Sequence, residues 1–158
     1  MQILEILLRS MGFVLSILLV VIGYIVAPLL FSYLDQVQAG NLVGRLLSHL
    51  NTGLLIALSV LLIVALVRSS TFIYSWLLIM SIVMVLALEH IISPAMNSIK
   101  LVNLNGLTKT SPDWSTFAMW HGMYQLLFLT LIIALFVWSL MNLNYMILNK
   151  KKVDKKSL

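Results

Sequence analysis

The sequence predicts an all-α membrane protein folded as a four-helix transmembrane bundle. Of its 158 residues, 61% are hydrophobic and only 9% are charged, and the mean hydropathy is +1.07. A soluble domain carries about 25% charged residues, so this chain lacks the polar surface that would cover a water-soluble globule. In addition, four apolar segments are each long enough to cross a bilayer, which takes about 20 residues.

These four segments lie at roughly residues 11–34, 48–67, 72–92 and 117–141. We assign residues 1–149 to one integral membrane domain and residues 150–158 to a basic cytoplasmic tail. The first span is expected to be retained rather than cleaved as a signal peptide. Acidic Glu5 precedes Arg9, and the apolar run is too long for a signal core.

A polar connection follows the first span. Pro28 falls late in that span, where it removes one backbone hydrogen bond, and neighbouring helices can satisfy the freed carbonyl. We interpret the residues after Asp35 as a turn, although Gly40 and Gly44 also have the spacing of a close-contact helix motif. His49 then opens the second span.

The second hairpin begins after a short link, residues 68–71, which places the second and third spans side by side and antiparallel. The third span is expected to end with Glu89 and His90, just before Ser93 and Pro94. Residues 95–113 are mixed and turn-rich, and they lead to a helix-start signature ahead of the last span.

Two features of the first hairpin recur in the second. The residues leading to Pro28 (Ile-Val-Ala-Pro) resemble those leading to Pro94 (Ile-Ile-Ser-Pro). Each proline is followed by a polar connection and a span with a histidine near its start, His49 or His121. Two hairpins that run in the same direction would form a parallel repeat about an axis along the membrane normal. A chance match is the alternative.

The orientation follows from the distribution of basic residues, since cytoplasmic loops carry an excess of Lys and Arg. With both termini cytoplasmic, the inner side holds Arg9, Arg68, Lys150, Lys151, Lys152, Lys155 and Lys156, and the outer side holds Arg45, Lys100 and Lys109. We therefore predict a multi-pass protein of the cell inner (plasma) membrane with both termini inside.

This orientation gathers the polar residues of the spans near the outer face. The candidates for a metal site there are His49, Glu89, His90 and His121. The candidates for a structural polar cluster are Pro28, Gly40, Gly44, Pro94, Asn97, His121, Tyr124 and Gln125. Ionisable groups inside spans are costly, and they usually face the bundle interior or a wet cavity.

Three interpretations of these residues stay open. The simplest is a structural plug, in which side chains of the last span hydrogen-bond across helices. The second is a metal or haem site, since imidazole suits copper, zinc and iron, although no two histidines have a tight ligand spacing. The third is a binding site for a substrate or proton on a transport path.

Other classes of function have little support in the sequence. The chain has no cysteine, so it has neither a disulfide framework nor a thiolate site. We find no Gly-x-Ser-x-Gly elbow and no glycine-rich phosphate loop, and we expect that the protein is not an enzyme. The net charge is +5, with five of the ten Lys and Arg residues at positions 150–158, which indicates membrane topology and not nucleic-acid binding.

The expected partners are the lipid bilayer and either further copies of the chain or another membrane protein, and no cofactor is assigned.

Three motifs resemble those of the transmembrane protein 205-like family. The first is Val26-Ala27-Pro28-Leu29-Leu30-Phe31, followed by Leu34, Ala39-Gly40 and Val43-Gly44. The second is Ser93-Pro94 with Asn97, and the third is Phe117 with His121 and Gln125. The chain departs from the family at His49-Leu50, where an aromatic pair is usual, at Tyr124, where a small hydroxyl residue is usual, and at Lys100, where arginine is usual.

The resemblance implies a four-helix membrane protein without an established biochemical activity, and for animal members a link to resistance against drugs or metal compounds. From residues and resemblance together we expect a small integral membrane protein of uncharacterised role. It would have a polar His/Glu/Gln cluster near the outer membrane face and would handle small solutes or metal compounds. The alternative is a histidine-ligated metal (copper-type) or haem membrane protein.

Overall fold

The structure, a computed structural model, describes residues 2–67, 74–104 and 106–154, with side chains for 6–67, 74–104, 106–145, 147 and 148. The chain is helical almost throughout these residues and contains no strand there. The elements are α1 (Gln2–Val20), η1 (Val21–Val26), α2 (Ala27–Tyr33), α3 (Gln36–Val67), α4 (Ser75–Ala87), η3 (Leu88–Ile92), α5 (Ser93–Val102) and α6 (Trp114–Asp154).

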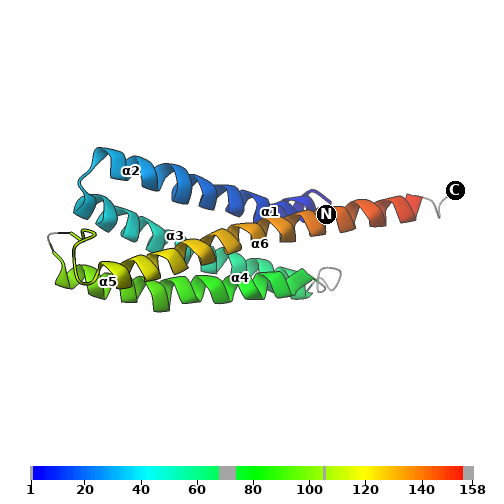
Figure 1. The fold of residues 1–158 in the computed structure, drawn as a ribbon. Coiled ribbons are helices and arrows are strands. Elements are labelled where there is room, and N and C mark those ends of the chain that lie inside the picture. The colour runs from blue at the N-terminus through cyan, green and yellow to red at the C-terminus, as the bar shows by residue number, and fades with distance from the viewer. Residues whose placement is uncertain (1, 68–73, 105, 155–158) are drawn as a thin grey trace.

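The elements build four antiparallel rods (Figure 1), each long and apolar enough to cross a membrane. The four spans are Ile6–Tyr33, Gln36–Val67, Ser75–Val102 and Trp114–Tyr145. The first and third spans start at the end of the bundle where α6 ends, and they run in the same direction. The predicted all-α, four-span bundle is confirmed.

Helix α6 is the central element of the bundle. It packs against α1 on one side and against α4, η3 and α5 on the other, while α3 packs on α4 and, at the far end, on α2. Leu131 and Leu135 of α6 are fully buried, as are Leu58 of α3 and Leu78 of α4. Side chains that face away from this core are apolar as well, as is typical of helices surrounded by lipid.

The connection between the first two spans is much shorter than predicted. Helix α3 begins at Gln36, because the Asp35 carboxylate accepts hydrogen bonds from the backbone N–H groups of Val37 and Gln38 at 3.0 and 2.9 Å. The turn predicted to follow Asp35 is therefore wrong, since Gly40 and Gly44 lie inside a continuous helix. Asp35 is an N-cap, and the polar residues after it form the first turns of the helix.

Both prolines are preceded by a short π-helical segment. Pro28 follows η1 and Pro94 follows η3, and in each case the residue just before the proline bonds five residues back: Ala27 to the Ile22 carbonyl, and Ser93 to that of Leu88. A proline lacks an N–H and its ring crowds the carbonyl four residues earlier. One extra residue in the turn lets the helix continue past it. The two motifs thus share a local geometry that the expected repeat requires.

The third span consequently does not end at Glu89 and His90, as the sequence had indicated. It continues through Pro94 to Val102, so it is a 28-residue span from Ser75. This correction places Glu89 near the middle of the span instead of at its outer end. The short link 68–71 lies outside the described residues, as do residues 155–158 of the tail, while residues 150–154 continue α6.

Replacement of Gly12 by alanine is expected to loosen the contact between α1 and α6. A Cβ atom on Gly12 would lie 2.8 Å from the carbonyl oxygen of Leu135 and 2.8 Å from Cε3 of Trp138. Overpacking of this kind costs about 1–3 kcal/mol. The measurement is the free energy of unfolding in mixed micelles titrated with a denaturing detergent.

Gly53→Ala is the matched control, because no atom lies within 4 Å of a Cβ built there. It should leave stability unchanged or raise it by up to about 1 kcal/mol, since alanine favours the helix. Equal losses for Gly12→Ala and Gly53→Ala would contradict the close contact.

Candidate functional site

A carboxylate from the third span is held by side chains from two other spans. Ser48 Oγ donates to Glu89 Oε1 at 2.5 Å, and Asn51 Nδ2 donates to Glu89 Oε2 at 3.0 Å. The same Asn51 nitrogen lies 3.5 Å from the Tyr124 hydroxyl. We call Ser48, Asn51, Glu89 and Tyr124 the Glu89 centre. It joins α3, η3 and α6 through one connected hydrogen-bond network.

Local helix geometry explains how the Glu89 centre forms. Ser48 and Asn51 are three residues apart in α3, so they lie on one face of that helix. Glu89 is the second residue of η3, which continues α4 directly, and its side chain reaches this face of α3. Asn51 is fully buried and Tyr124 is 4% exposed, whereas Glu89 is only half-buried.

The Glu89 centre lies deep along the spans. Glu89 stands about 20 Å from either end of its span, and Asn51 is at a similar depth in α3, at 1.5 Å per residue. The structure therefore places Glu89 in the middle of its span, whereas the sequence had placed it at the end of that span. An ionisable side chain at this depth is rare in membrane proteins and commonly functional.

Glu89 has no ion-pair partner among the described residues. Its two carboxylate oxygens are occupied by a hydroxyl and an amide, both of them neutral donors. The nearest Lys along its own span, Lys100, donates instead to the Gly40 carbonyl at 3.3 Å. The carboxylate is thus solvated by neutral dipoles and not neutralised by a cation, which distinguishes it from a structural ion pair.

The three histidines are not part of the Glu89 centre. His49 is exposed and its Nδ1 lies 2.7 Å from the Arg45 carbonyl in its own helix. His90 is exposed, and the exposed His121 stacks on Phe117 with ring centroids 5.9 Å apart. Within the part of the chain that the structure describes, no group of three or more His, Asp or Glu residues could hold a metal ion.

Most of the remaining predicted site residues are exposed. Of the three polar residues at the start of the last span, only Tyr124 enters the bundle, because His121 and Gln125 are exposed. Asn97 is exposed, as are Pro28 and Pro94 on the surface of their helices. The three residues lie within about one turn of α6, as their spacing predicts, but only Tyr124 is buried.

Gly40 and Gly44 form the seat of a lysine side chain. Their Cβ positions, if occupied, would each lie 3.9 Å from Lys100 Nζ, which reaches across from α5 to the Gly40 carbonyl. The glycine spacing noted in the sequence thus accommodates an ammonium group at the α2–α3 end of the bundle. Gln36 Nε2 also donates to the Leu107 carbonyl at 3.0 Å, which ties the 103–113 connection to the start of α3.

A second polar contact joins the first and last spans at the opposite end. Arg9 is 5% exposed and donates from a guanidinium nitrogen to the Asn142 carbonyl at 3.0 Å. Ser139 Oγ donates to the Arg9 carbonyl at 2.8 Å, and the guanidinium lies 6.0 Å from the Tyr145 ring centre. These contacts join helix backbones, so we assign them to packing and not to chemistry.

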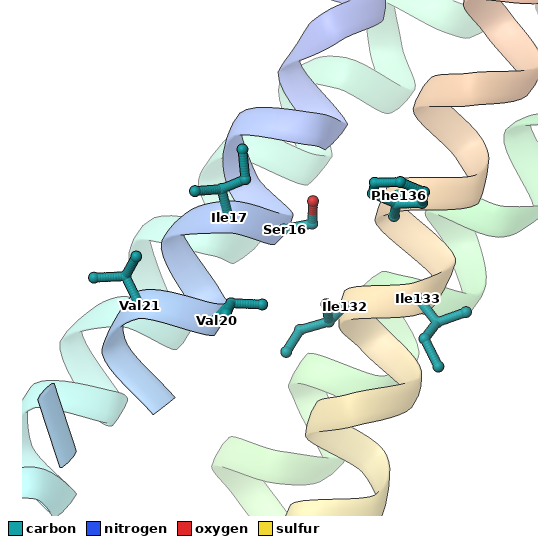
Figure 2. Close-up of a pocket in the computed structure, with 7 residues that line it drawn as sticks. All are labelled: Ser16, Ile17, Val20, Val21, Ile132, Ile133 and Phe136. Atoms are coloured by element: carbon teal, nitrogen blue, oxygen red, sulfur yellow. The ribbon is translucent and has the colours of Figure 1, made fainter. Parts of the chain in front are cut away.

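A groove of about 280 Å³ opens between α1 and α6 where α1 approaches its π-helical segment (Figure 2). Its walls include Val20 and Ile132, with Phe136 near its upper end. Ser16, its one polar side chain, already donates to the Phe13 carbonyl at 2.8 Å. The groove offers no group for chemistry and suits hydrocarbon.

Sequence reasoning missed Ser48 and Asn51. Their signal is weak but readable: an amide and a hydroxyl stand three residues apart at the head of an apolar run, and Asn is unfavourable in a lipid-facing position. What the sequence does not show is that Glu89 lies opposite them, because that depends on how α3 packs against the third span.

A family model described as "Domain of unknown function (DUF4149)" matches residues 14–103, which is more than half of the chain. The match includes both proline motifs, and from the Glu89 centre it includes Ser48, Asn51 and Glu89 but not Tyr124. No curated protein and no solved structure matches the chain.

Removal of the Asn51 side chain is expected to destabilise the bundle. Asn51→Ala leaves the carboxylate of Glu89 with one donor in place of two, which costs about 1–2 kcal/mol. Unfolding in a denaturing detergent measures this loss.

Thr52→Ala, at the next position of α3, is the control. Thr52 is exposed and its hydroxyl donates only to the Ser48 carbonyl of its own helix, so the change should stay within about 0.5 kcal/mol. If both variants lost the same amount, the hydrogen bond to Glu89 would contribute nothing.

Proposed function

The chain belongs to the DUF4149 family, whose domain has no assigned function, and from that premise we propose that it handles a small solute within the membrane at the Glu89 centre. The observation that carries this proposal is a carboxylate at mid-span that is bound by neutral donors and has no cation partner in the described chain. Packing alone would be served as well by glutamine, which avoids a charge in the bilayer.

The position of Glu89 supports this role. A π-helical turn inside an α-helix is often found at a functional site, and Glu89 belongs to one. Transporter sites commonly lie near the bilayer midplane, where a helix departs from regular geometry. A solute that is cationic, or that donates hydrogen bonds, would complement the carboxylate.

We also propose the finer assignments that the sequence suggested. The motifs shared with the transmembrane protein 205-like family at residues 26–44 and 93–97 fall inside the matched region, which supports kinship with that family. The excess of basic residues at the end where α1 begins and α6 ends supports an inner-membrane location with both termini cytoplasmic. We further propose that the protein is not an enzyme and that its partners are lipid and either copies of itself or another membrane protein.

The proposal is tested by solute uptake into liposomes that contain the purified full chain. The probes are ethidium, K⁺ and Cu²⁺, each offered under an imposed inside-negative potential. We expect uptake of at least one probe above that of empty liposomes, and a loss of at least tenfold in Glu89→Gln, because the variant keeps the shape but not the charge.

Asp35→Asn is the control variant, since asparagine also caps a helix and Asp35 lies outside the spans. It should leave uptake unchanged. Wild-type uptake of none of the probes, or equal uptake by wild type and Glu89→Gln, would refute the proposal. Equal uptake by wild type and Glu89→Gln, together with a lower stability of Glu89→Gln, would identify the Glu89 centre as a structural plug.

A further inference from the structure

One acceptor atom in the Glu89 centre has no donor. Asn51 is fully buried, its Nδ2 donates to Glu89, and its Oδ1 has no hydrogen-bond partner. A buried acceptor without a donor is uncommon, since it costs the desolvation of that atom. This atom belongs to the same amide that touches the carboxylate.

The groups around Glu89 are a poor ligand set for a hard divalent cation. Hard cations such as Ca²⁺ and Mg²⁺ take six or more oxygen ligands, and their sites present lone pairs and not N–H or O–H groups. Here Ser48 and Asn51 each donate to one carboxylate oxygen, which leaves each oxygen one further lone pair, and no group of three or more His, Asp or Glu residues of the described chain could hold a metal ion. The smallest cation, a proton, needs only one oxygen of the carboxylate.

The neighbours of Glu89 can serve both of its charge states. When the carboxylate is ionised, the Asn51 Nδ2 donates to Oε2, as observed. When Oε2 carries a proton, a half-turn of the Asn51 amide places Oδ1 where Nδ2 was, and Oδ1 then accepts from the new O–H. The Tyr124 hydroxyl is both a donor and an acceptor, so it can follow either orientation of the amide.

Among the described residues, no other titratable group on the elements packed against η3 is bonded to Glu89, apart from the Tyr124 hydroxyl that it meets through Asn51. Helix α4 carries no titratable residue, and α6 presents Tyr124 as its buried group, with His121 exposed one turn away. On η3 and α5, His90 is exposed and Lys100 is bonded to the Gly40 carbonyl. On α3, the charged Arg45 and the neighbouring His49 are exposed.

We propose that Glu89 is a reversible proton-binding site of the membrane domain, with Asn51 as the rotating amide that stabilises both the carboxylate and the carboxylic acid. Binding adds one proton from water to Oε2 and breaks no covalent bond. The inference rests on the proposed function, because it assigns a proton as the ion that binds at the Glu89 centre while the protein handles its solute.

Infrared spectroscopy of the full chain in liposomes tests the proposal during a pH titration. The protein has five Asp and Glu residues, so subtraction of the Glu89→Gln spectra isolates the signal of Glu89. We expect a carboxylic-acid carbonyl band that appears on acidification, is absent in Glu89→Gln and persists at an altered frequency in Glu89→Asp. In Asn51→Leu the band should shift, because the amide partner is gone, whereas Thr52→Ala should leave it unchanged.

Absence of a Glu89-dependent band in correctly folded protein would overturn the proton site, with folding judged by circular dichroism and gel filtration. A band that is unaffected by Asn51→Leu would overturn the rotating amide. These outcomes are distinct from failure of the proposed function. A titrating band without solute uptake would support the proton site and refute solute handling. Solute uptake without the band would support solute handling and refute the proton site.

Discussion

The structure depends on one constraint of the bilayer: hydrocarbon offers no hydrogen bonds, so each span must pair its own backbone groups. Pro28 and Pro94 each remove a donor from a span. The chain keeps both spans continuous by inserting a π-helical turn ahead of each proline. That local solution lengthens the third span to Val102 and, in doing so, moves Glu89 from an expected helix end to the middle of the bundle.

Apolar packing alone would leave the helices free to slide, because lipid chains are as apolar as the side chains that pack. Two sets of polar contacts set the register instead. At the end where α1 begins, Arg9 and Ser139 join the first and last spans through backbone carbonyls. At mid-depth, the Glu89 centre joins the second, third and fourth spans. Each set contains a buried amide oxygen without a donor among the described residues, that of Asn142 in the first set and that of Asn51 in the second. Only the second set holds a carboxylate whose partners are neutral donors.

Much of the fold was predictable from the sequence, and the site was predictable in part. The four spans follow from length and hydropathy. Glu89 and Tyr124 were identified as candidates, yet they were grouped with His49, His90 and His121, which prove to be exposed. Treating Ser93 and Pro94 as a helix end misplaced Glu89 along its span, and the exposure of the three histidines was not readable from their spacing. Gly40 and Gly44 were noted for their spacing, but their neighbour, the Lys100 ammonium, comes from a segment 60 residues away in the chain.

The sequence by itself determined that this chain is a four-span helical membrane protein, because apolar length and scarcity of charge are properties of composition that no folding detail can alter. Only the tertiary structure decided which polar residues meet. Glu89 and Asn51 are 38 residues apart in the sequence, so their contact depends on how the second and third spans pack, and Tyr124 joins them only through the packing of the fourth span.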